Sequence, residues 1–302
     1  MALPQIAVSG QRELVARYAA RAEELGFDGL WSLDSALAGG TSHTPIVDGL
    51  HTLTFAAAHT SAARLGIAVI VLPRRVPALL ARELASIDRL SGGRLTVGVG
   101  LGGSDGSEAA LGVPVDRRAR RLSEGVEILR AAWSQDEVSY GGELFSFSGV
   151  SLEPKPLQQP GPPIWFGAGK PPALRRAARL GDGWIGAGSS ATADFLEQVP
   201  LLRRELEAAG RDPDAFPKSK RVYVAVEDDE AEGRERLAAV LDNMYGRPGL
   251  TDRVAICGPA ERIAEEVRTL RDAGAHELLL HSLYSPLEQL ERLAEVRRLA
   301  LA

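Results

Sequence analysis

Residues 65–103 read LGIAVIVLPRRVPALLARELASIDRLSGGRLTVGVGLGG, and this stretch has the clearest pattern of secondary structure in the chain. An apolar, β-branched run at 67–71 is followed by a turn between prolines, and apolar residues then recur near helical spacing up to Leu90. A Ser-Gly-Gly break leads to a second β-type run at 95–99, which ends in a cluster of glycines. The pattern predicts a strand, a helix and a second strand, followed by a loop with almost no side chains.

The same alternation continues along the chain. Strands are predicted at residues 5–8, 29–33, 64–71, 95–99, 164–166, 183–185, 221–226 and 277–281. Helices are predicted at residues 11–25, 49–60, 77–90, 117–134, 172–180, 193–209, 230–245, 260–273 and 287–299. Strands that are each followed by a helix indicate an α/β fold of the (β/α)8 TIM-barrel type, with a doubly wound open sheet as the alternative. We expect a single domain over residues 1–302.

Two stretches depart from the alternation. Residues 140–147 (YGGELFSF) predict a hairpin with a Gly-Gly turn. Residues 153–163 contain five prolines, which favour a stiff, extended connector over a helix. We expect both stretches to form one insertion before the fifth strand.

Composition restricts the classes of partner. The chain has 302 residues, 45% of them hydrophobic, and a formal net charge of -5, which argues against nucleic acid or an anionic membrane as the main partner. The single cysteine, Cys257, excludes an internal disulfide and a CxxC metal site. Neither a signal segment nor a membrane-length apolar run is visible, so we expect a cytoplasmic protein.

Ligand sites of barrels lie where strands end and the following loops begin. Asp34 follows the strand at 29–33, where a carboxylate can contact a cofactor or substrate, or can instead cap a turn. Gly98, Gly100 and Gly103 match G-x-G-x-x-G, but no helix pattern begins at the third glycine, so the match to a dinucleotide-binding motif is weak. The glycines still allow a planar or phosphorylated ligand to approach the backbone closely.

Gly169 and Lys170 follow the strand at 164–166 and lead through two prolines into a helix. Free N–H groups at a helix start, together with Lys170, favour an anion site, and a capped loop with proline in the first turn is the alternative. His43 shares a loop with Asp34, although a lone histidine is more often structural than catalytic. Neither the Ser/His/Asp order of a hydrolase nor an HxxxH helix is present, so no metal site is predicted.

Together these residues resemble the luciferase-like monooxygenase superfamily, in particular its branch of oxidoreductases that depend on the deazaflavin coenzyme F420. The resemblance lies in FDGLWSLD (27–34), the stretch at 63–102, LEPKPLQQPGPPIWFGAG (152–169) and RRAARLGDGW (175–184). It implies hydride transfer between F420 and a small organic substrate, and a homodimer. An FMN-dependent two-component monooxygenase with a partner reductase is the first alternative, and a catalytically degenerate flavin-binding relative is the second.

The resemblance also implies roles for individual residues. Asp34 matches a carboxylate that contacts the deazaflavin. Ala68 and Val69 match a strand bulge, with a non-proline cis peptide in many relatives, that supports the cofactor ring. Other positions match the lining of the ring pocket, namely Val71, Leu101 and Gly102. The positions that match the cofactor-phosphate loop are Gly169, Lys170, Pro172 and Ala173.

The chain departs from the family pattern at positions that bear on the reaction. Ser35 stands where many relatives have histidine, and Gly103 stands where sugar-phosphate dehydrogenases have a glutamate proton donor. Residues 187–190 contain none of the lysines expected for a substrate phosphate. A sugar phosphate is therefore not implied, and the predicted catalytic residues are Asp34 and His43.

Overall fold

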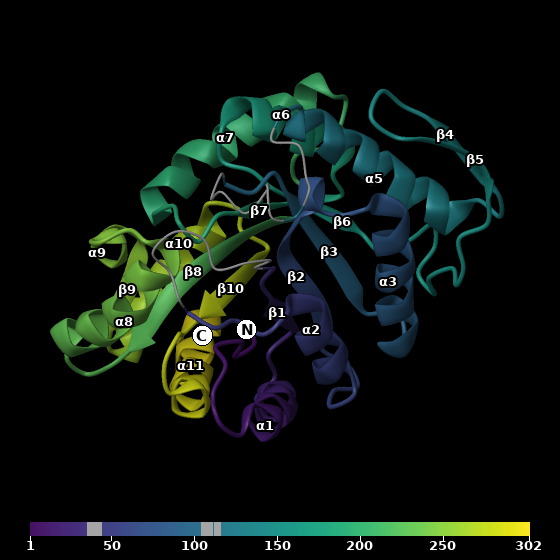
Figure 1. Cartoon of the computed structure of the whole chain (residues 1–302). Coiled ribbons are helices and arrows are strands. Elements are labelled where there is room, and N and C mark those ends of the chain that lie inside the picture. Colours follow the sequence, from purple (N-terminus) through teal and green to yellow (C-terminus); the bar gives the residue numbers. More distant parts are fainter. Residues whose placement is uncertain (35–43, 104–110, 112–115) are drawn as a thin grey trace.

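The computed structural model describes residues 1–34, 44–103, 111 and 116–302 of the chain. At its centre is a curled sheet of parallel strands with helices around the outside (Figure 1). The strands that neighbour one another along this sheet are β1 (Gly29–Ser32), β2 (Arg64–Val71), β3 (Leu95–Gly100), β6 (Ile164–Gly167), β7 (Gly183–Gly186), β8 (Lys218–Val226) and β10 (Glu277–His281). The predicted α/β fold with a parallel sheet is confirmed.

The helices follow the predicted segments to within a few residues. They are α1 (Gln11–Glu24), α2 (Gly49–Ala57), α3 (Pro77–Leu90), α5 (Arg118–Ser134), α6 (Pro171–Leu180), α7 (Thr192–Ala208), α8 (Glu230–Tyr245), α10 (Ala260–Asp272) and α11 (Pro286–Leu301), with the shorter η1 (Leu72–Arg74) and α9 (Leu250–Val254). No helix in the described part of the chain is both long and apolar enough to cross a membrane.

The N-terminal segment differs from its prediction. Residues 5–8 form only an isolated antiparallel bridge between Ile6 and Ile46, so the strand predicted there was wrong. Instead, Ala2 pairs with Trp31 of β1 and donates its N–H to the oxygen of Leu280 in β10 at 3.0 Å. This short segment therefore links the two edge strands of the curled sheet. The segment is too short to show the alternation of apolar and polar residues that predicts a strand. Its pairing is set by the edges of β1 and β10 on either side.

A further strand, β9 (Ala255–Gly258), was absent from the sequence prediction. It pairs in parallel with the second half of β8, from Tyr223 to Val226. Four residues between two helices are too few to distinguish a strand from a loop by periodicity.

Apolar side chains fill the inside of the curled sheet. The indole rings of Trp31 and Trp165 lie 5.7 Å apart between centroids. Ala68, Ile185 and Leu279 are buried in the same cluster, and Val69 packs against it. The curled sheet is thus packed with side chains at this level, and any ligand must bind beyond them.

Glycines on neighbouring strands make room for Val69. An added β-carbon on Gly98, Gly100 or Gly167 would lie 3.1, 2.7 or 3.1 Å, respectively, from a methyl carbon of Val69. The glycine cluster that ends the strand at 95–99 therefore has a packing reason. Because Gly98 and Gly100 of β3 have no side chains, the valine of β2 can enter the interior.

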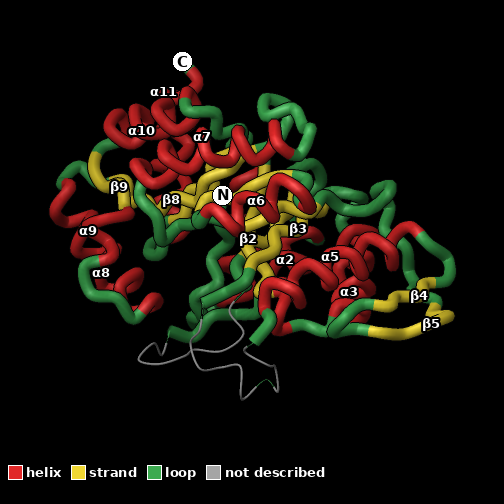
Figure 2. Tube along the Cα trace, turned by 90° about the horizontal axis from the view of Figure 1, so that it is seen from above, coloured by secondary structure: helices red, strands yellow, loops and turns green. Residues whose placement is uncertain are grey.

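Between α5 and β6, the strands β4 (Val138–Gly141) and β5 (Ser146–Val150) pair antiparallel at the periphery of the molecule (Figure 2). The buried carboxylate of Glu124 in α5 anchors their turn. It accepts hydrogen bonds from the backbone amides of Glu143, Leu144 and Phe145 at 2.9, 3.0 and 3.1 Å. Residues 153–163, all of which the structure describes, contain no helix or strand.

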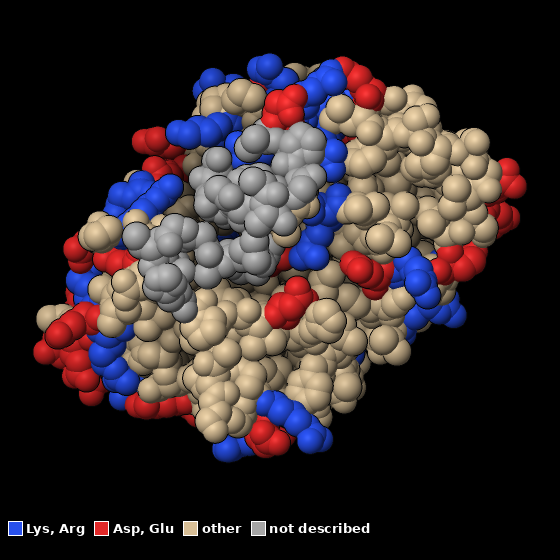
Figure 3. Space-filling model, in the orientation of Figure 1, with Lys and Arg blue, Asp and Glu red and all other residues tan. Residues whose placement is uncertain are grey.

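Charged side chains of both signs alternate around the rim of the face drawn in Figure 3. Ion pairs also join neighbouring helices, such as Arg21 of α1 with Glu291 of α11 at 2.6 Å and Arg175 of α6 with Glu205 of α7 at 3.1 Å. Exposed pairs of this kind are worth about 1 kcal/mol or less. The packed interior therefore accounts for most of the stability.

We expect Gly98→Ala to lower the free energy of unfolding by about 3 kcal/mol, because overpacking at a strand contact forces the backbone to shift. The added β-carbon would lie 2.2 Å from the backbone oxygen of Ile67. Urea denaturation followed by circular dichroism measures the change. Gly141→Ala in β4 is the control, since apart from chain neighbours nothing in the described structure lies within 4 Å of its added β-carbon. Equal stability of the two variants would contradict this packing.

Candidate active site

The interior of the sheet changes from apolar to polar toward the carboxyl ends of β8 and β10. Leu279 belongs to the apolar cluster, and the next residue on the same face of β10 is His281. The strand register places Arg221 of β8 beside Leu279 and Tyr223 beside His281. Ligands of parallel α/β folds bind at the carboxyl ends of the strands, so this polar layer is the first candidate site.

The guanidinium of Arg221 joins three elements. Its Nη1 donates to the backbone oxygen of Ala68 in β2 at 3.2 Å. Its Nη2 donates to the hydroxyl of Tyr223 and, at 2.8 Å, to that of Tyr245 at the end of α8. Its Nε is buried and has no hydrogen-bond partner in the described structure. The Nε–H of this cationic side chain therefore remains unused.

His281 and Tyr223 are stacked aromatic groups, with ring centroids 5.2 Å apart. Burial, together with the charge of Arg221, holds the pKa of His281 well below its usual range, so the imidazole is neutral at pH 7. Burial also raises the pKa of Tyr223 well above its usual value, so the hydroxyl keeps its proton. The layer thus carries the positive charge of Arg221 next to two uncharged aromatic groups.

The five residues predicted to support a cofactor ring or to line its pocket lie in β2 and directly after β3. The Ala68–Val69 peptide is cis and lies in a bulge where β2 shifts register against β3, as the family resemblance implied. Val71 contacts Gly102, where an added β-carbon would lie 2.5 Å from its Cγ1, and Leu101 packs against the core. Their contact with a cofactor stays a prediction.

Asp34 anchors the end of β2. One carboxylate oxygen accepts the N–H of Val71 at 3.0 Å, and the other pairs with Arg75 at 2.6 Å. The side chain is 2% exposed. In this structure Asp34 therefore holds the end of β2 and Arg75 in place. His43, the second predicted catalytic residue, lies outside the described residues.

The predicted phosphate loop follows β6 and leads into α6. The backbone oxygen of Lys170 accepts the amides of Ala173 and Leu174, both at 2.9 Å. Pro172 and the proline before it have no N–H, so they contribute no donor to the predicted anion site. Within the described structure, the amides left for an anion are those of Gly169 and Lys170. The exposed ammonium group of Lys170 adds a positive charge.

Gln198 of α7 lies against this loop and was missed in the sequence. An added β-carbon on Gly169 would lie 3.3 Å from its Nε2, and its Oε1 is buried without a partner in the described structure. A glutamine within a helix gives no sequence signal. Only the packing of α7 beside the loop identifies it.

The polar layer of β8 was missed as well, although it left a signal. Arg221 and Tyr223 occupy alternate positions of the predicted strand at 221–226, whose other residues are apolar, so both point to the same face. A buried strand with charged and phenolic residues on one face indicates a polar interior. Tyr245 gives no such signal, because α8 brings it to the site only in the folded chain.

Lys220 of β8 clamps the loop that follows β7. Its Nζ donates to the backbone oxygens of Ala187 at 2.5 Å and Ser190 at 2.7 Å. The same loop brings Gly188 against Arg221, because an added β-carbon there would lie 2.6 Å from Nε. Burial, with repulsion from Arg221, lowers the pKa of Lys220 to about 7. This lysine positions the loop.

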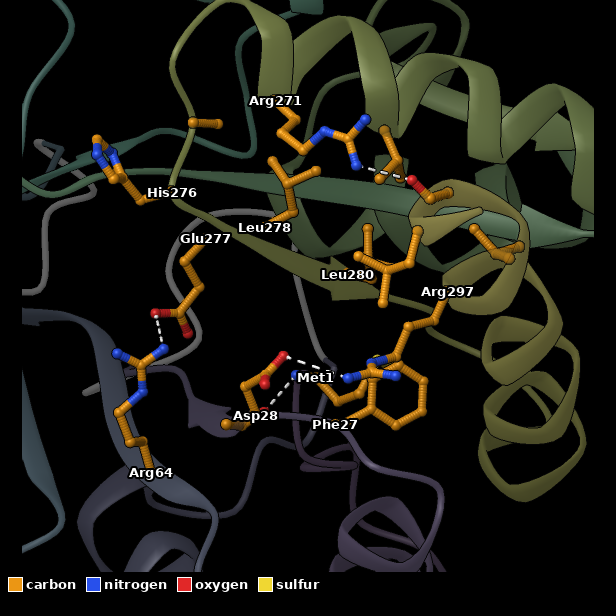
Figure 4. Close-up of a pocket in the computed structure, with 16 residues that line it drawn as sticks. Met1, Phe27, Asp28, Arg64, Arg271, His276, Glu277, Leu278, Leu280 and Arg297 are labelled. Atoms are coloured by element: carbon orange, nitrogen blue, oxygen red, sulfur yellow. Dashed lines mark hydrogen bonds and ion pairs between the residues drawn. The ribbon is translucent and has the colours of Figure 1, made fainter.

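A separate cavity of about 370 Å³ lies at the opposite ends of the strands, where β1, β2 and β10 begin (Figure 4). Glu277 pairs there with Arg64 at 3.0 Å and accepts a hydrogen bond from Trp31 at 2.6 Å. Asp28 faces Arg297 at 4.0 Å. These charges are paired within the protein, and the cavity lies at the amino ends of the strands. The polar layer therefore remains the candidate site.

We expect Asp34→Asn to lower the free energy of unfolding by about 2 kcal/mol, because it removes the charge that pairs with Arg75 and weakens the bond to Val71. Chemical denaturation measures the loss. Asp136→Asn, at an exposed position, is the control and should leave the stability unchanged. An unchanged Asp34→Asn midpoint would show that this carboxylate does not anchor β2.

Lys220 should make the stability depend on pH. Its folded pKa of about 7 is below that of the unfolded chain, so the unfolded state binds more protons above pH 7. Relative to Lys220→Met, the wild type should gain roughly 1 kcal/mol for each pH unit between 7 and 10. The difference should stay constant between pH 5 and 6.5, where both states are protonated. Urea titrations across this range test it, and a difference that falls above pH 7 would refute it.

Comparisons with known proteins identify the family of this chain. A family model described as luciferase-like monooxygenase matches residues 5–248. The F420-dependent glucose-6-phosphate dehydrogenase of Kineococcus radiotolerans is 33% identical over 230 residues, which cover 73% of this chain and 66% of that protein. The FMNH(2)-dependent dimethylsulfone monooxygenase of Pseudomonas putida is 34% identical over 168 residues, covering 55% and 45% of the two chains.

The fold has solved counterparts. The crystal structure of monooxygenase RslO1 from Streptomyces bottropensis superposes with a TM-score of 0.83 at 22% identity, covering 100% of this chain and 99% of that chain. The matched stretches span only 45% and 66% of the two relatives named above. The family model, however, covers well over half of the chain, and the protein therefore belongs to the luciferase-like monooxygenase family.

Proposed function

We propose that this protein is an oxidoreductase that transfers a hydride between coenzyme F420 and a small organic substrate. One observation carries the proposal: the two parts of the predicted cofactor site lie side by side. Val69, in the bulge, lies against Gly167, the last residue of β6, and the predicted phosphate loop begins two residues later. A ligand with a planar ring and a phosphate could span this distance.

The residues present fit such a ligand. The bulge at Ala68 and Val69 would lie behind the ring. Lys170, with the amide of Gly169, would hold the phosphate at the start of α6. The buried, unpartnered Oε1 of Gln198 could accept a hydrogen bond from a hydroxyl of the cofactor side chain. When bound, the deazaflavin supplies the hydride chemistry, and the protein supplies binding and orientation.

The chain's own polar layer would meet the substrate. Tyr223 keeps its hydroxyl proton, and His281 stays neutral, so neither group adds a charge to the reacting centre. Arg221 remains cationic and reaches the bulge through the oxygen of Ala68. The substrate would therefore lie between the predicted ring position and a layer of hydrogen-bond donors.

An FMN-dependent monooxygenase with a partner reductase is the second candidate. The sulfone monooxygenase from Pseudomonas putida supports it, at 34% identity over 168 residues. The bulge and the loop after β6 suit either ring system. A flavin-binding relative without catalysis is a third candidate, which Ser35 and Gly103 motivate.

Titration with F420 and with FMN, followed by cofactor fluorescence, tests the proposal. We expect F420 to bind about tenfold more tightly than FMN. Lys170→Gln should weaken F420 binding roughly tenfold, since it removes the charge beside the phosphate. Arg179→Gln is the matched control, because Arg179 is exposed in the last turn of the same helix. Tight FMN binding without F420 binding would favour the monooxygenase, and binding without turnover would favour the third candidate.

The remaining expectations belong to the same proposal. We propose a single domain over residues 1–302, with the curled sheet closed as a (β/α)8 barrel. The hairpin and the proline-rich segment would form one insertion before its fifth strand. The protein would act in the cytoplasm as a homodimer.

A further inference from the structure

We infer that Arg221, with Tyr223 and Tyr245, binds an anionic oxygen group of the substrate, either a carboxylate or a sulfonate. The inference rests on the proposed function for the statement that the bound molecule is the substrate. The binding site itself follows from the charge, burial and hydrogen-bond inventory of the three side chains.

The charge of Arg221 is not neutralised by the protein. Its hydrogen-bond partners are the backbone oxygen of Ala68 and two phenol hydroxyls, all of them uncharged. Two other cations near the candidate site have different arrangements: Arg75 pairs with Asp34, and Lys220 has its pKa lowered by burial. A guanidinium cannot lose its proton in this way. A cation held among neutral groups in the interior favours an anion as its ligand.

Arg221, Tyr223 and Tyr245 together have more hydrogen-bond donors than the described part of the protein has acceptors for them. Nε–H of Arg221 has no acceptor in the described structure. The hydroxyls of Tyr223 and Tyr245 lie 3.0 Å apart, so one donates to the other, while both accept from Arg221. No described residue accepts the second hydroxyl proton. These donors without protein acceptors favour a ligand that brings oxygen lone pairs.

The position of this group suits a substrate. Arg221 reaches the bulge of β2 through Ala68, and the bulge is the predicted support of the cofactor ring. The loop that lies against Nε contributes Gly188, which has no side chain to serve as an acceptor. Arg221 also keeps some exposed surface, although its Nε is buried. An oxyanion held here would bring the rest of a small molecule close to the predicted ring.

Binding without cofactor tests the inference separately from the proposed function. Hexanoate, hexanesulfonate and the neutral 2-hexanone are titrated into the purified protein at low salt and followed by ligand-observed NMR. We expect at least one of the two anions to bind about tenfold or more tightly than the ketone. The comparison of the two anions identifies the group that the site prefers.

Variants connect the binding to the three residues. Arg221→Met should weaken the preferred anion about tenfold or more without affecting the ketone, and Arg221→Lys should restore part of the loss. Tyr245→Phe is a smaller change at a partly buried side chain and should weaken binding of the anion several-fold. This variant tests the inference if Arg221→Met fails to fold. Arg203→Gln, which removes only an exposed ion pair with Asp214, should leave binding unchanged.

Several outcomes would overturn the inference. Equal binding of the ketone and both anions would do so, as would anion binding that survives both Arg221→Met and Tyr245→Phe. Loss of F420 or FMN affinity in Arg221→Met with unchanged anion binding would assign the arginine to the cofactor instead. Anion binding in a protein that binds neither cofactor would leave the anion site standing and would refute the proposed function.

Discussion

The bulge in β2 is the constraint on which the interior of this protein depends. A register shift between Ile67 and Ile70 turns the side chain of Val69 into the curled sheet. The valine fits there because β3 and β6 present glycines to it. The same bulge brings the oxygen of Ala68 within 3.2 Å of Arg221. Packing at the glycines and polar contacts at the candidate site therefore depend on one local distortion.

The charged side chains at the candidate site have two roles: some hold backbone segments in place, and one is available to bind a ligand. Both carboxylate oxygens of Asp34 accept hydrogen bonds, one from Val71 and one from Arg75, and the ammonium group of Lys220 donates to a neighbouring loop. Both side chains hold backbone around the site. Arg221 differs because its Nε–H has no partner in the described structure and its hydrogen-bond partners carry no negative charge. A ligand at this site would therefore accept a hydrogen bond from Arg221.

Most of the fold could be predicted from periodicity, because buried parallel strands and amphipathic helices repeat at different spacings. The prediction failed at 5–8 and at 255–258, where segments are short and strand edges decide the pairing. The candidate site was less predictable. The resemblance located the bulge, but the supporting role of Asp34 appears only when Val71 and Arg75 are brought to its two oxygens.

The sequence by itself determined the alternation of strands and helices, the glycine cluster after the strand at 95–99 and the family that the chain resembles. It did so because each of these is a local pattern of residue types. Only the tertiary structure decided which polar groups meet and which remain without partners. Arg221, Tyr245 and Ala68 lie on three different elements, namely β8, the end of α8 and β2. These three residues form hydrogen bonds to one another only in the folded chain. Burial there removes the water that would otherwise bind to their polar groups.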